Sequence, residues 1–492
     1  MGGVEEQKKQ HTRGKLTVRD RIDLLCDPHS FDEIGILTHH TSMHSDLKDR
    51  KTPADGVVCG FGYADKRPVA IIAYDFTVLA GSMGKNGETK VARLRAQAFE
   101  RRIPLVWLLD SAGARVQEFT GSQFAGTGVL FRDQVLLSGV IPQVAAVMGP
   151  TAAGTSYIPA LADFVPMVKG TGSMALAGPS LVKTAVGEEI DIESLGGSRV
   201  HTQLSGVGHL ECSDDRSCID AIRSYLSYFP SCYQASLPIG APSNVENLND
   251  EIFEILPSSA RRAYDMKKVI RWLSQGVDFF EIQAGWAKNI VVGFTRLGGY
   301  PIGIVANQPE VLGGALDLDA SDKATHFMNL CDAFGIPLLF LHDCPGFMVG
   351  SKMEHAGIIR HGAKMLYAVS RLTVPKFSVV VRKSYGAGYF VMCGRGFEPD
   401  LIVAWPGAEI SLMSPEGAVN IITDASEDKK DRVEQYRHLV GGERSAEEAC
   451  IDDVIDPRHT ARLLFNQLKL LVPKHDHERS RLLTKKHGVS PV

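Results

Sequence analysis

A long internal repeat constrains this chain more than any other feature of its sequence. Four residues of the first half recur 233 positions later in similar strand or turn contexts: Pro68 and Pro301, Pro104 and Pro337, Asp110 and Asp343, and Pro142 and Pro375. One match could arise by chance, but four matches at one offset indicate a duplicated domain of more than 200 residues. Solenoid repeats have periods of roughly 20–50 residues, so this spacing predicts two similar domains rather than a repeat array.

The two copies differ in length near their beginnings. The segment Phe31-Asp32-Glu33-Ile34 is similar to Phe279-Phe280-Glu281-Ile282, which lies 248 positions later. The first copy therefore carries 15 extra residues, in the polar segment between Ile34 and Gly60. The stretch from Pro230 to Pro257 is rich in Pro, Ser and Asn, a composition typical of a linker between domains. We therefore expect an N-terminal domain at residues 1–235 and a C-terminal domain at residues 236–492.

The local patterns predict an α/β fold. Short apolar runs separated by turns from Gly56 to Thr77 are typical of a β-meander. Lys90 to Arg101 has an apolar face at helical spacing, and Leu105 to Leu109 is an apolar run typical of a buried strand. Val144 to Met148 predicts a second such strand.

Composition excludes several classes of protein. The chain has 492 residues with 53 Lys and Arg against 57 Asp and Glu, so it lacks the basic surface of a nucleic-acid-binding protein. Its nine cysteines form no CxxC pair and are odd in number, which fits a reducing compartment. The first residues contain no apolar signal region, and no uninterrupted apolar run reaches the roughly 18–20 residues of a membrane helix. We expect a cytoplasmic protein.

Two stretches rich in small residues are the candidates for chemistry. They run from Gly149 to Tyr157 and from Lys383 to Tyr389, each after an apolar strand. Small residues at a strand-to-helix junction let a ligand oxygen approach the free amides of the first helical turn. Tight packing explains one such stretch equally well. Because Ala153-Gly154 and Ala387-Gly388 recur 234 residues apart, we favour two backbone anion holes, which suit a reaction that develops two oxyanions.

Other chemical signatures are weaker. The sequence contains no GxxxxGK[ST] or HExxH motif, so we expect this chain to bind neither ATP nor a metal ion. Ser82 lies near, but not in, a nucleophile-elbow pattern and has no evident partners for a catalytic triad. His342 beside Asp343 is compatible with acid–base chemistry and equally with a hydrogen-bonded turn.

Several long motifs resemble those of one protein family. They are 10–22 (QHTRGKLTVRDRI), 110–115 (DSAGAR), 196–201 (GGSRVH), 343–347 (DCPGF), 357–364 (GIIRHGAK) and 485–488 (KKHG). In this order they are similar to the carboxyltransferase (β) subunits of biotin-dependent acyl-CoA carboxylases, of the propionyl-CoA and methylcrotonyl-CoA carboxylase type. The resemblance covers essentially the whole chain.

The resemblance implies a fold and a reaction. The expected fold is two tandem crotonase-like domains of stacked ββα units. The expected reaction moves a carboxyl group from N1-carboxybiotin to the α-carbon of an acyl-CoA, or to the γ-carbon of an enoyl chain. Charge develops on the biotin ureido oxygen and on the thioester oxygen of the acyl-CoA. Biotin itself can act as the base, so the resemblance requires no protein base.

The resemblance also implies the site residues. Ala153 and Gly154 fall on the pair that holds the thioester oxygen, and Ala387 and Gly388 fall on the pair that holds the biotin oxygen. The first pair is usually Gly-Gly in the family, whereas this chain has Ala153. Ser111, Ala112 and Gly113 are implied in substrate binding. Phe390 occupies a position that influences acyl-chain preference, often as Asp or Ile, so the acyl group cannot be carried over.

The implied partners are a biotin carboxylase and a biotin carrier, because this chain has no biotinylation motif. The family also implies a homo-oligomer, commonly a hexamer, in which the first half of one subunit faces the second half of another. Two alternatives remain open. One is the carboxyltransferase subunit of a sodium-pumping, biotin-dependent acyl-CoA decarboxylase, and the other is a non-catalytic scaffold.

Overall fold

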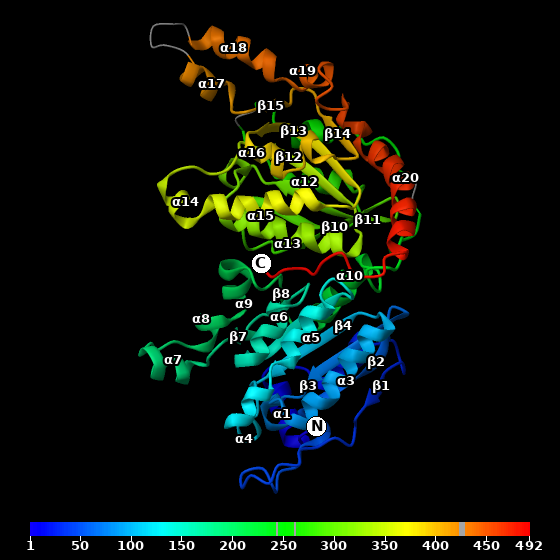
Figure 1. Cartoon of the computed structure of the whole chain (residues 1–492), viewed down its shortest axis with the longest axis vertical. Coiled ribbons are helices and arrows are strands. Elements are labelled where there is room, and N and C mark those ends of the chain that lie inside the picture. The colour runs from blue at the N-terminus through cyan, green and yellow to red at the C-terminus, as the bar shows by residue number, and fades with distance from the viewer. Residues whose placement is uncertain (243–244, 260–261, 423–428) are drawn as a thin grey trace. The chain divides into compact units, whose positions relative to one another are not determined.

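The computed structural model describes residues 1–242, 245–259, 262–422 and 429–492 (Figure 1). The chain divides into two compact units. Unit 1 contains residues 1–235 and 483–491, and unit 2 contains residues 236–482 and residue 492. Residues 243 and 244 of the expected linker lie outside the described part. Among the described residues, none of the helices is long and apolar enough to cross a membrane.

Unit 1 is built on an eight-stranded sheet in the order β1-β2-β3-β4-β5-β6-β8, with β7 paired to β5. The first three strands pair antiparallel and the remaining pairs are parallel. The strands are β1 (Asp32–Ile34), β2 (Val57–Ala64), β3 (Arg67–Tyr74), β4 (Leu105–Ser111), β5 (Gln143–Ala152), β6 (Pro166–Val168), β7 (Ser173–Ala175) and β8 (Leu210–Cys212). The expected meander is the β2–β3 hairpin, and the two expected buried strands are β4 and β5.

The α-helices of unit 1 are α1 (Val4–Thr12), α2 (Val18–Leu25), α3 (Lys85–Arg101), α4 (Val116–Phe119), α5 (Val129–Leu137), α6 (Tyr157–Ala160), α7 (Pro179–Val186), α8 (Ile192–Gly196), α9 (Ser198–Val200) and α10 (Asp215–Tyr228). The longest, α3, contains the predicted helix at Lys90–Arg101 and begins five residues earlier. Its buried positions Val91, Leu94 and Ala98 recur at helical spacing and face the sheet, which explains why this segment is a helix.

Unit 2 has a second eight-stranded sheet in the order β16-β14-β13-β12-β11-β10-β9, with β15 paired to β13. The strands are β9 (Phe280–Ile282), β10 (Ile290–Leu297), β11 (Tyr300–Asn307), β12 (Leu338–Cys344), β13 (Lys376–Tyr385), β14 (Leu401–Ala404), β15 (Glu409–Ser411) and β16 (Asp453–Val454). Every residue of β12 is buried, as expected for a parallel strand covered on both faces.

The helices of unit 2 are α11 (Ile252–Ile255), α12 (Met266–Leu273), α13 (Leu318–Phe334), α14 (Ser351–Ala356), α15 (Ile358–Arg371), α16 (Ala387–Val391), α17 (Pro415–Ile422), α18 (Lys429–Val440), α19 (Gly442–Glu447) and α20 (Thr460–Ser480). Figure 1 shows α13 and α15 side by side along the sheet. Short 3-10 turns connect the elements of both units.

The duplication inferred from the sequence is confirmed element by element. Strands β2 to β5 begin and end 233 residues before β10 to β13, and α3 does the same relative to α13. Strand β1 precedes β9 by 248 residues. The 15 extra residues of the first half therefore lie between β1 and β2, as the sequence predicts.

Candidate active site

The first small-residue stretch forms the end of β5 and a tight helical turn. Strand β5 continues through Gly149–Ala152, further than the expected strand at Val144–Met148, because Pro150–Ala152 pair with β7. A 3-10 turn over Ala153–Ser156 follows and leads into α6. The first amides of such a turn have no partner within it, so they are available to a ligand oxygen.

Ala153 has an unusual backbone conformation at the start of this turn. Its φ is 55°, in the left-handed region where a Cβ is disfavoured. Ala153 is exposed and Gly154 is partly exposed. The residue at which the family usually has Gly is therefore one at which Gly would relieve strain. The exposed amides fit the role that the resemblance implies for this pair.

Asp110, which precedes this region on β4, is the centre of a buried ion network. Its carboxylate accepts hydrogen bonds from Lys15 Nζ at 2.7 Å, Arg21 NH1 at 3.0 Å and Gln10 Nε2 at 2.9 Å. Arg21 Nε also donates to Asp215 at 2.8 Å, and its NH2 donates to the carbonyl of Met148 at 3.3 Å. Removing one partner from so buried a network would leave an uncompensated charge. The network therefore fixes the ends of β4 and β5 beside the turn.

Gly149 lies directly against this network. A Cβ on Gly149 would be 1.9 Å from Asp110 Oδ1 and 2.8 Å from Lys15 Nζ. Burial lowers the pKa of Lys15, although the charge of Asp110 opposes the shift. The small residue at this position serves packing.

The loop after β4 places Ser111, Ala112 and Gly113 differently from one another. Ser111 is fully buried, and its hydroxyl donates to the carbonyl of Gly81 at 2.7 Å and accepts from the amide of Gly113 at 3.1 Å. Gly113 has a φ of 95° and is also buried, so only Ala112 is exposed. Among these three predicted substrate-binding residues, the side chain of Ala112 is the one that solvent reaches.

The second small-residue stretch has the same strand-to-turn layout. Strand β13 ends at Tyr385, Gly386 is the N-cap with a φ of 55°, and α16 begins at Ala387. Ala387 is exposed, whereas Gly388 is buried. A Cβ on Gly388 would lie 2.7 Å from Cys344 Sγ and 3.1 Å from Gly346 Cα. Glycine at position 388 thus lets α16 pack against the end of β12.

The two turns differ by one residue. Ala153 and Gly386 each follow the last residue of equivalent strands, and both have a φ of 55°. The pair Ala387-Gly388 therefore lies one position further along its turn than Ala153-Gly154, which accounts for the spacing of 234 rather than 233.

Asp343 repeats the role of Asp110 with different partners. Its carboxylate accepts hydrogen bonds from Arg382 Nε at 2.9 Å and from Lys383 Nζ, both on the neighbouring strand β13. The preceding residue, His342, faces elsewhere: its Nδ1 lies 3.0 Å from Ser384 Oγ, and the ring is fully buried. Burial lowers the pKa of His342 to about 3. The two alternatives for this dipeptide are thereby separated, since the imidazole is neutral, buried and bonded within the protein.

A cavity of about 1160 Å³ adjoins the second turn within unit 2. Gly386 and Ala387 line it, together with polar residues of β13, β15 and α18: Arg382, Lys383, Tyr385, Glu409 and Arg437. The Tyr385 hydroxyl donates to Glu409, which also accepts from Arg437 Nε at 3.1 Å. Burial, followed by the hydrogen bond to Glu409, raises the pKa of Tyr385.

These cavity residues include groups that the sequence did not single out. Tyr385 lies inside the predicted stretch, but Glu409 and Arg437 come from distant segments. Only the parallel pairing of β13 with β15 brings Glu409 beside Lys383. A signal in the sequence was the repeat itself, because β7 pairs with β5 in the same way in unit 1.

Phe390 lies on α16 and is 48% exposed. Its ring packs near Tyr389 and Phe397, with centroids 6.2 Å away in each case. It does not line the described cavity beside Ala387. Phe390 is therefore placed to contact a ligand or a neighbouring chain from outside that cavity.

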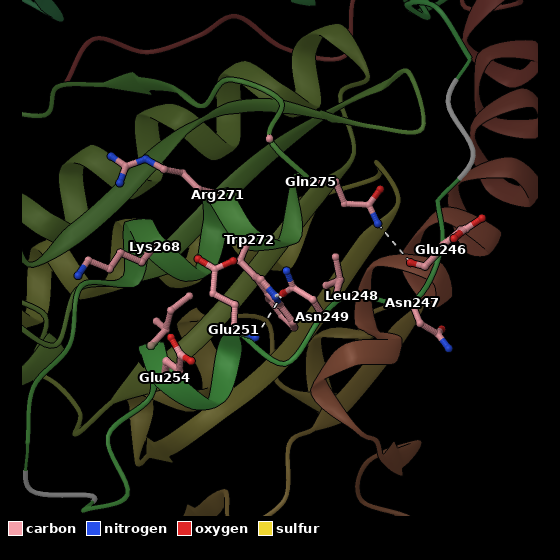
Figure 2. Close-up of a pocket in the computed structure, with 12 residues that line it drawn as sticks. Glu246, Asn247, Leu248, Asn249, Glu251, Glu254, Lys268, Arg271, Trp272 and Gln275 are labelled. Atoms are coloured by element: carbon pink, nitrogen blue, oxygen red, sulfur yellow. Dashed lines mark hydrogen bonds between the residues drawn. The ribbon is translucent and has the colours of Figure 1, made fainter.

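A second cavity, of about 1050 Å³, lies elsewhere in unit 2 between residues 246–255 and α12 (Figure 2). Trp272 Nε1 donates to Asn249 at 2.8 Å, and Gln275 Nε2 donates to the carbonyl of Glu246 at 3.2 Å. Lys268 and Arg271 extend to the side opposite Glu246 in Figure 2. None of the predicted site residues lines this cavity, whose polar groups bind the segment after the linker to α12.

Comparisons with known proteins agree with this arrangement. The carboxyl transferase domain family matches residues 9–489. A propionyl-CoA carboxylase carboxyltransferase subunit of Haloferax mediterranei is 42% identical, covering 100% of this chain and 96% of the relative. A methylmalonyl-CoA decarboxylase subunit alpha of Veillonella parvula is 40% identical, with 100% and 96% covered.

One solved structure gives the same result at the level of the fold. The transcarboxylase 12S crystal structure, described as a hexamer assembly and solved with methylmalonyl-CoA and methylmalonic acid bound, superposes with a TM-score of 0.94. It is 41% identical, and the match covers 100% of this chain and 96% of that one.

Proposed function

This chain belongs to the carboxyl transferase family, and we propose that it is the carboxyltransferase subunit of a biotin-dependent acyl-CoA carboxylase. It is an α/β protein of two crotonase-like domains and a carboxyltransferase that acts on an acyl-CoA. Beyond this, the proposal assigns unit 1 to the acyl-CoA and unit 2 to biotin, with Ala153-Gly154 and Ala387-Gly388 as the two oxyanion-binding pairs.

The observation that carries the proposal is the cavity beside the second turn. It exposes the start of α16 at Ala387, and its volume of about 1160 Å³ exceeds what a small bicyclic ring needs. Its walls combine hydrogen-bond donors, such as Arg382 and Lys383, with the acceptor Glu409. A ureido group has one acceptor oxygen and N–H donors, so these residues fit biotin. When bound, biotin would supply the carboxyl group and the base for the α-proton.

The chain's own contribution is electrostatic. At the second turn the amides of Ala387 and Gly388 would donate to the ureido oxygen. At the first turn the amides of Ala153 and Gly154 would donate to the thioester oxygen and stabilise the enolate. Each such donor stabilises a developing oxyanion by about 2.7–4 kcal/mol, so two pairs can supply much of the rate enhancement without a protein acid or base.

For the substrate we propose a short acyl-CoA of the propionyl/methylmalonyl-CoA pair. The support is that the Haloferax relative is named for propionyl-CoA and that the transcarboxylase 12S crystal contains methylmalonyl-CoA. Phe390 is the residue that we expect to modify the preference, because a hydrophobic contact discriminates one methylene by only about 1–3 kcal/mol.

For the assembly we propose a hexamer in which a second copy completes each active site, with a separate biotin carboxylase and biotin carrier as partners. The hexamer of transcarboxylase 12S supports the first part. We also propose a cytoplasmic location, since an odd number of cysteines without CxxC pairs fits a reducing compartment.

The test combines the purified chain with its biotinylated partner, ATP and bicarbonate, and offers acetyl-, propionyl-, butyryl- and 3-methylcrotonyl-CoA in turn. We expect carboxylation of propionyl-CoA at the highest kcat/KM. Absence of carboxylation with all four substrates would contradict the carboxylase proposal.

A second candidate is the reverse reaction in a sodium-pumping decarboxylase. The relative of Veillonella parvula, named methylmalonyl-CoA decarboxylase subunit alpha, favours it. The two candidates differ in the partner gene: a biotin carboxylase beside this gene supports carboxylation, whereas a multi-span membrane decarboxylase supports the reverse.

A further inference from the structure

The end of helix α5 is held by the C-terminal segment of the chain, residues 483–491 (red in Figure 1). Lys485 Nζ donates to three carbonyls at the end of this helix, those of Val135 at 3.4 Å, Leu136 at 3.0 Å and Ser138 at 2.6 Å. The last carbonyls of a helix have no partner within it and carry the negative end of its dipole. The ammonium of Lys485 is therefore the C-cap of α5.

The neighbouring contacts fix the position of this segment closely. Ser138 Oγ accepts from the amide of Val489 at 2.8 Å and donates to the carbonyl of the same residue at 3.1 Å. A Cβ on Gly139 would lie 2.1 Å from the carbonyl oxygen of His487, so the two backbones are in direct contact. The segment is thus seated in a place formed for it.

Helix α5 in turn packs on the first turn. Gln134, fully buried on α5, donates through Nε2 to the carbonyl of Ile158 at 2.6 Å. The rings of Phe131 and Tyr157 meet edge to face with centroids 5.7 Å apart. A Cβ on Gly154 would lie 3.5 Å from Phe131 Cζ, within van der Waals contact. These contacts reach the turn that begins at Ala153 from its helical side.

Helix α5 has little apolar burial of its own. Of its nine residues only Leu130, Gln134 and Leu137 are buried, while Val135 and Leu136 are at least half exposed. An element with so few buried contacts has low local stability. Its position therefore depends on the polar contacts at its end.

We propose that Lys485 is a positioning residue for the first oxyanion-binding turn. By capping α5 it holds Phe131 and Gln134 against residues 154–158, and so keeps the amides of Ala153 and Gly154 aimed at the thioester oxygen. This inference rests on the proposed function of the first turn. Lys485 does not touch the substrate, and it acts on the acyl-CoA side of the reaction alone.

The kinetic test uses the full chain with methylmalonyl-CoA as carboxyl donor and biocytin as soluble acceptor. We expect Lys485→Met to raise the KM for the acyl-CoA about tenfold and leave the KM for biocytin within about twofold of the wild type. Lys485→Arg keeps the cation and should restore most of the affinity. The control is Lys474→Met, an exposed lysine on α20, which should change neither constant. Equal changes in both KM values, or none, would overturn the proposal.

A second readout is independent of activity. Hydrogen exchange of the amides at residues 153–161 should quicken in Lys485→Met while residues 386–392 keep the wild-type rate. Ser138→Ala, which only loses the hydroxyl contacts with Val489, should give a smaller change of the same kind and covers the case in which Lys485→Met does not fold. Unchanged exchange in these variants refutes the positioning role. If the wild type transfers no carboxyl group, the proposed function fails, and exchange alone decides this inference.

Discussion

Gly388 and Cys344 are in direct contact where α16 meets the end of β12. A Cβ on Gly388 would lie 2.7 Å from Cys344 Sγ, closer than any real Cβ contact. Gly388 has an ordinary helical conformation, so the requirement for glycine here comes from space and not from the backbone angle. The thiol itself is buried, and burial raises its pKa to about 12, so it is a neutral packing group.

The first prediction concerns this contact. Gly388→Ala should displace the first turn of α16 and its amides, because Cys344 Sγ and Gly346 Cα leave no room for a methyl group. Loss of an oxyanion donor typically lowers kcat about 10²–10³-fold. We expect a fall of that order in the initial rate of carboxyl transfer, with the oligomer unchanged on gel filtration.

The double variant Gly388→Ala with Cys344→Ala is the matched control. Removing the sulfur makes room for the new methyl group, and about tenfold of the lost rate should return. Gly396→Ala, at a glycine with no atom within 4 Å of a built Cβ, should be neutral. Full activity of Gly388→Ala alone would contradict the assignment of α16 to an oxyanion site.

The second prediction concerns the strained Ala153. A left-handed conformation costs a residue with a Cβ about 1–2 kcal/mol, whereas glycine adds about 0.4–1 kcal/mol of unfolded-state entropy. Ala153→Gly should therefore raise the free energy of unfolding by about 0.5–1 kcal/mol, with carboxyl transfer retained. Differential scanning calorimetry checks this as a small rise in Tm.

The neighbouring alanine provides the opposite sign. Ala152 has an extended backbone with a φ of −117°, so glycine there gains no relief and only adds entropy to the unfolded chain. Ala152→Gly should lower Tm. If both variants lower Tm equally, Ala153 is not strained in solution.

The repeat made the fold largely predictable from the sequence. Prolines such as Pro68 and Pro301 sit in or beside buried strands, where few residues are tolerated, so the offset of 233 survives in β2 to β5 and β10 to β13. The resemblance then supplied the reaction. Both rest on local patterns that can be read along the chain.

The surroundings of the site were less predictable, because they depend on distant partners. Asp110 and Asp343 are equivalent in sequence, yet Lys15 and Arg21 hold the first while Arg382 and Lys383 hold the second. The implied substrate contact of Ser111 meets a hydroxyl that is bonded inward. Neither the direction of a side chain nor a partner some 90 residues away can be inferred from spacing.

The third prediction concerns the acyl-chain preference. Phe390 is 48% exposed on α16, so truncating its side chain should leave Tm almost unchanged. Phe390→Ala enlarges the space next to the second turn, and the ratio of kcat/KM for butyryl-CoA over propionyl-CoA should rise about tenfold or more. Phe253→Ala removes an equally exposed ring elsewhere in unit 2 and should not change this ratio. An unchanged ratio in Phe390→Ala would exclude Phe390 from the acyl site.

The fourth prediction is a dependence of stability on pH that originates at His342. Burial lowers the pKa of this imidazole to about 3 in the folded chain, against an ordinary value of 6.5. Between these two pH values the unfolded state binds more protons than the folded state, so acid favours unfolding. The contribution of His342 is complete above pH 6.5 and is lost progressively as the pH falls towards 3, at about 1.4 kcal/mol per pH unit.

Urea unfolding at pH 7 and pH 5 measures this contribution. His342→Asn cannot titrate but keeps a polar partner for Ser384, so its free energy of unfolding should fall less between the two pH values than that of the wild type. The difference should be about 2 kcal/mol. His355→Asn removes an exposed histidine of α14 and should behave as the wild type. If His342→Asn shows the wild-type dependence on pH, His342 is accessible to protons in the folded state and the buried, neutral imidazole described beneath α16 is wrong.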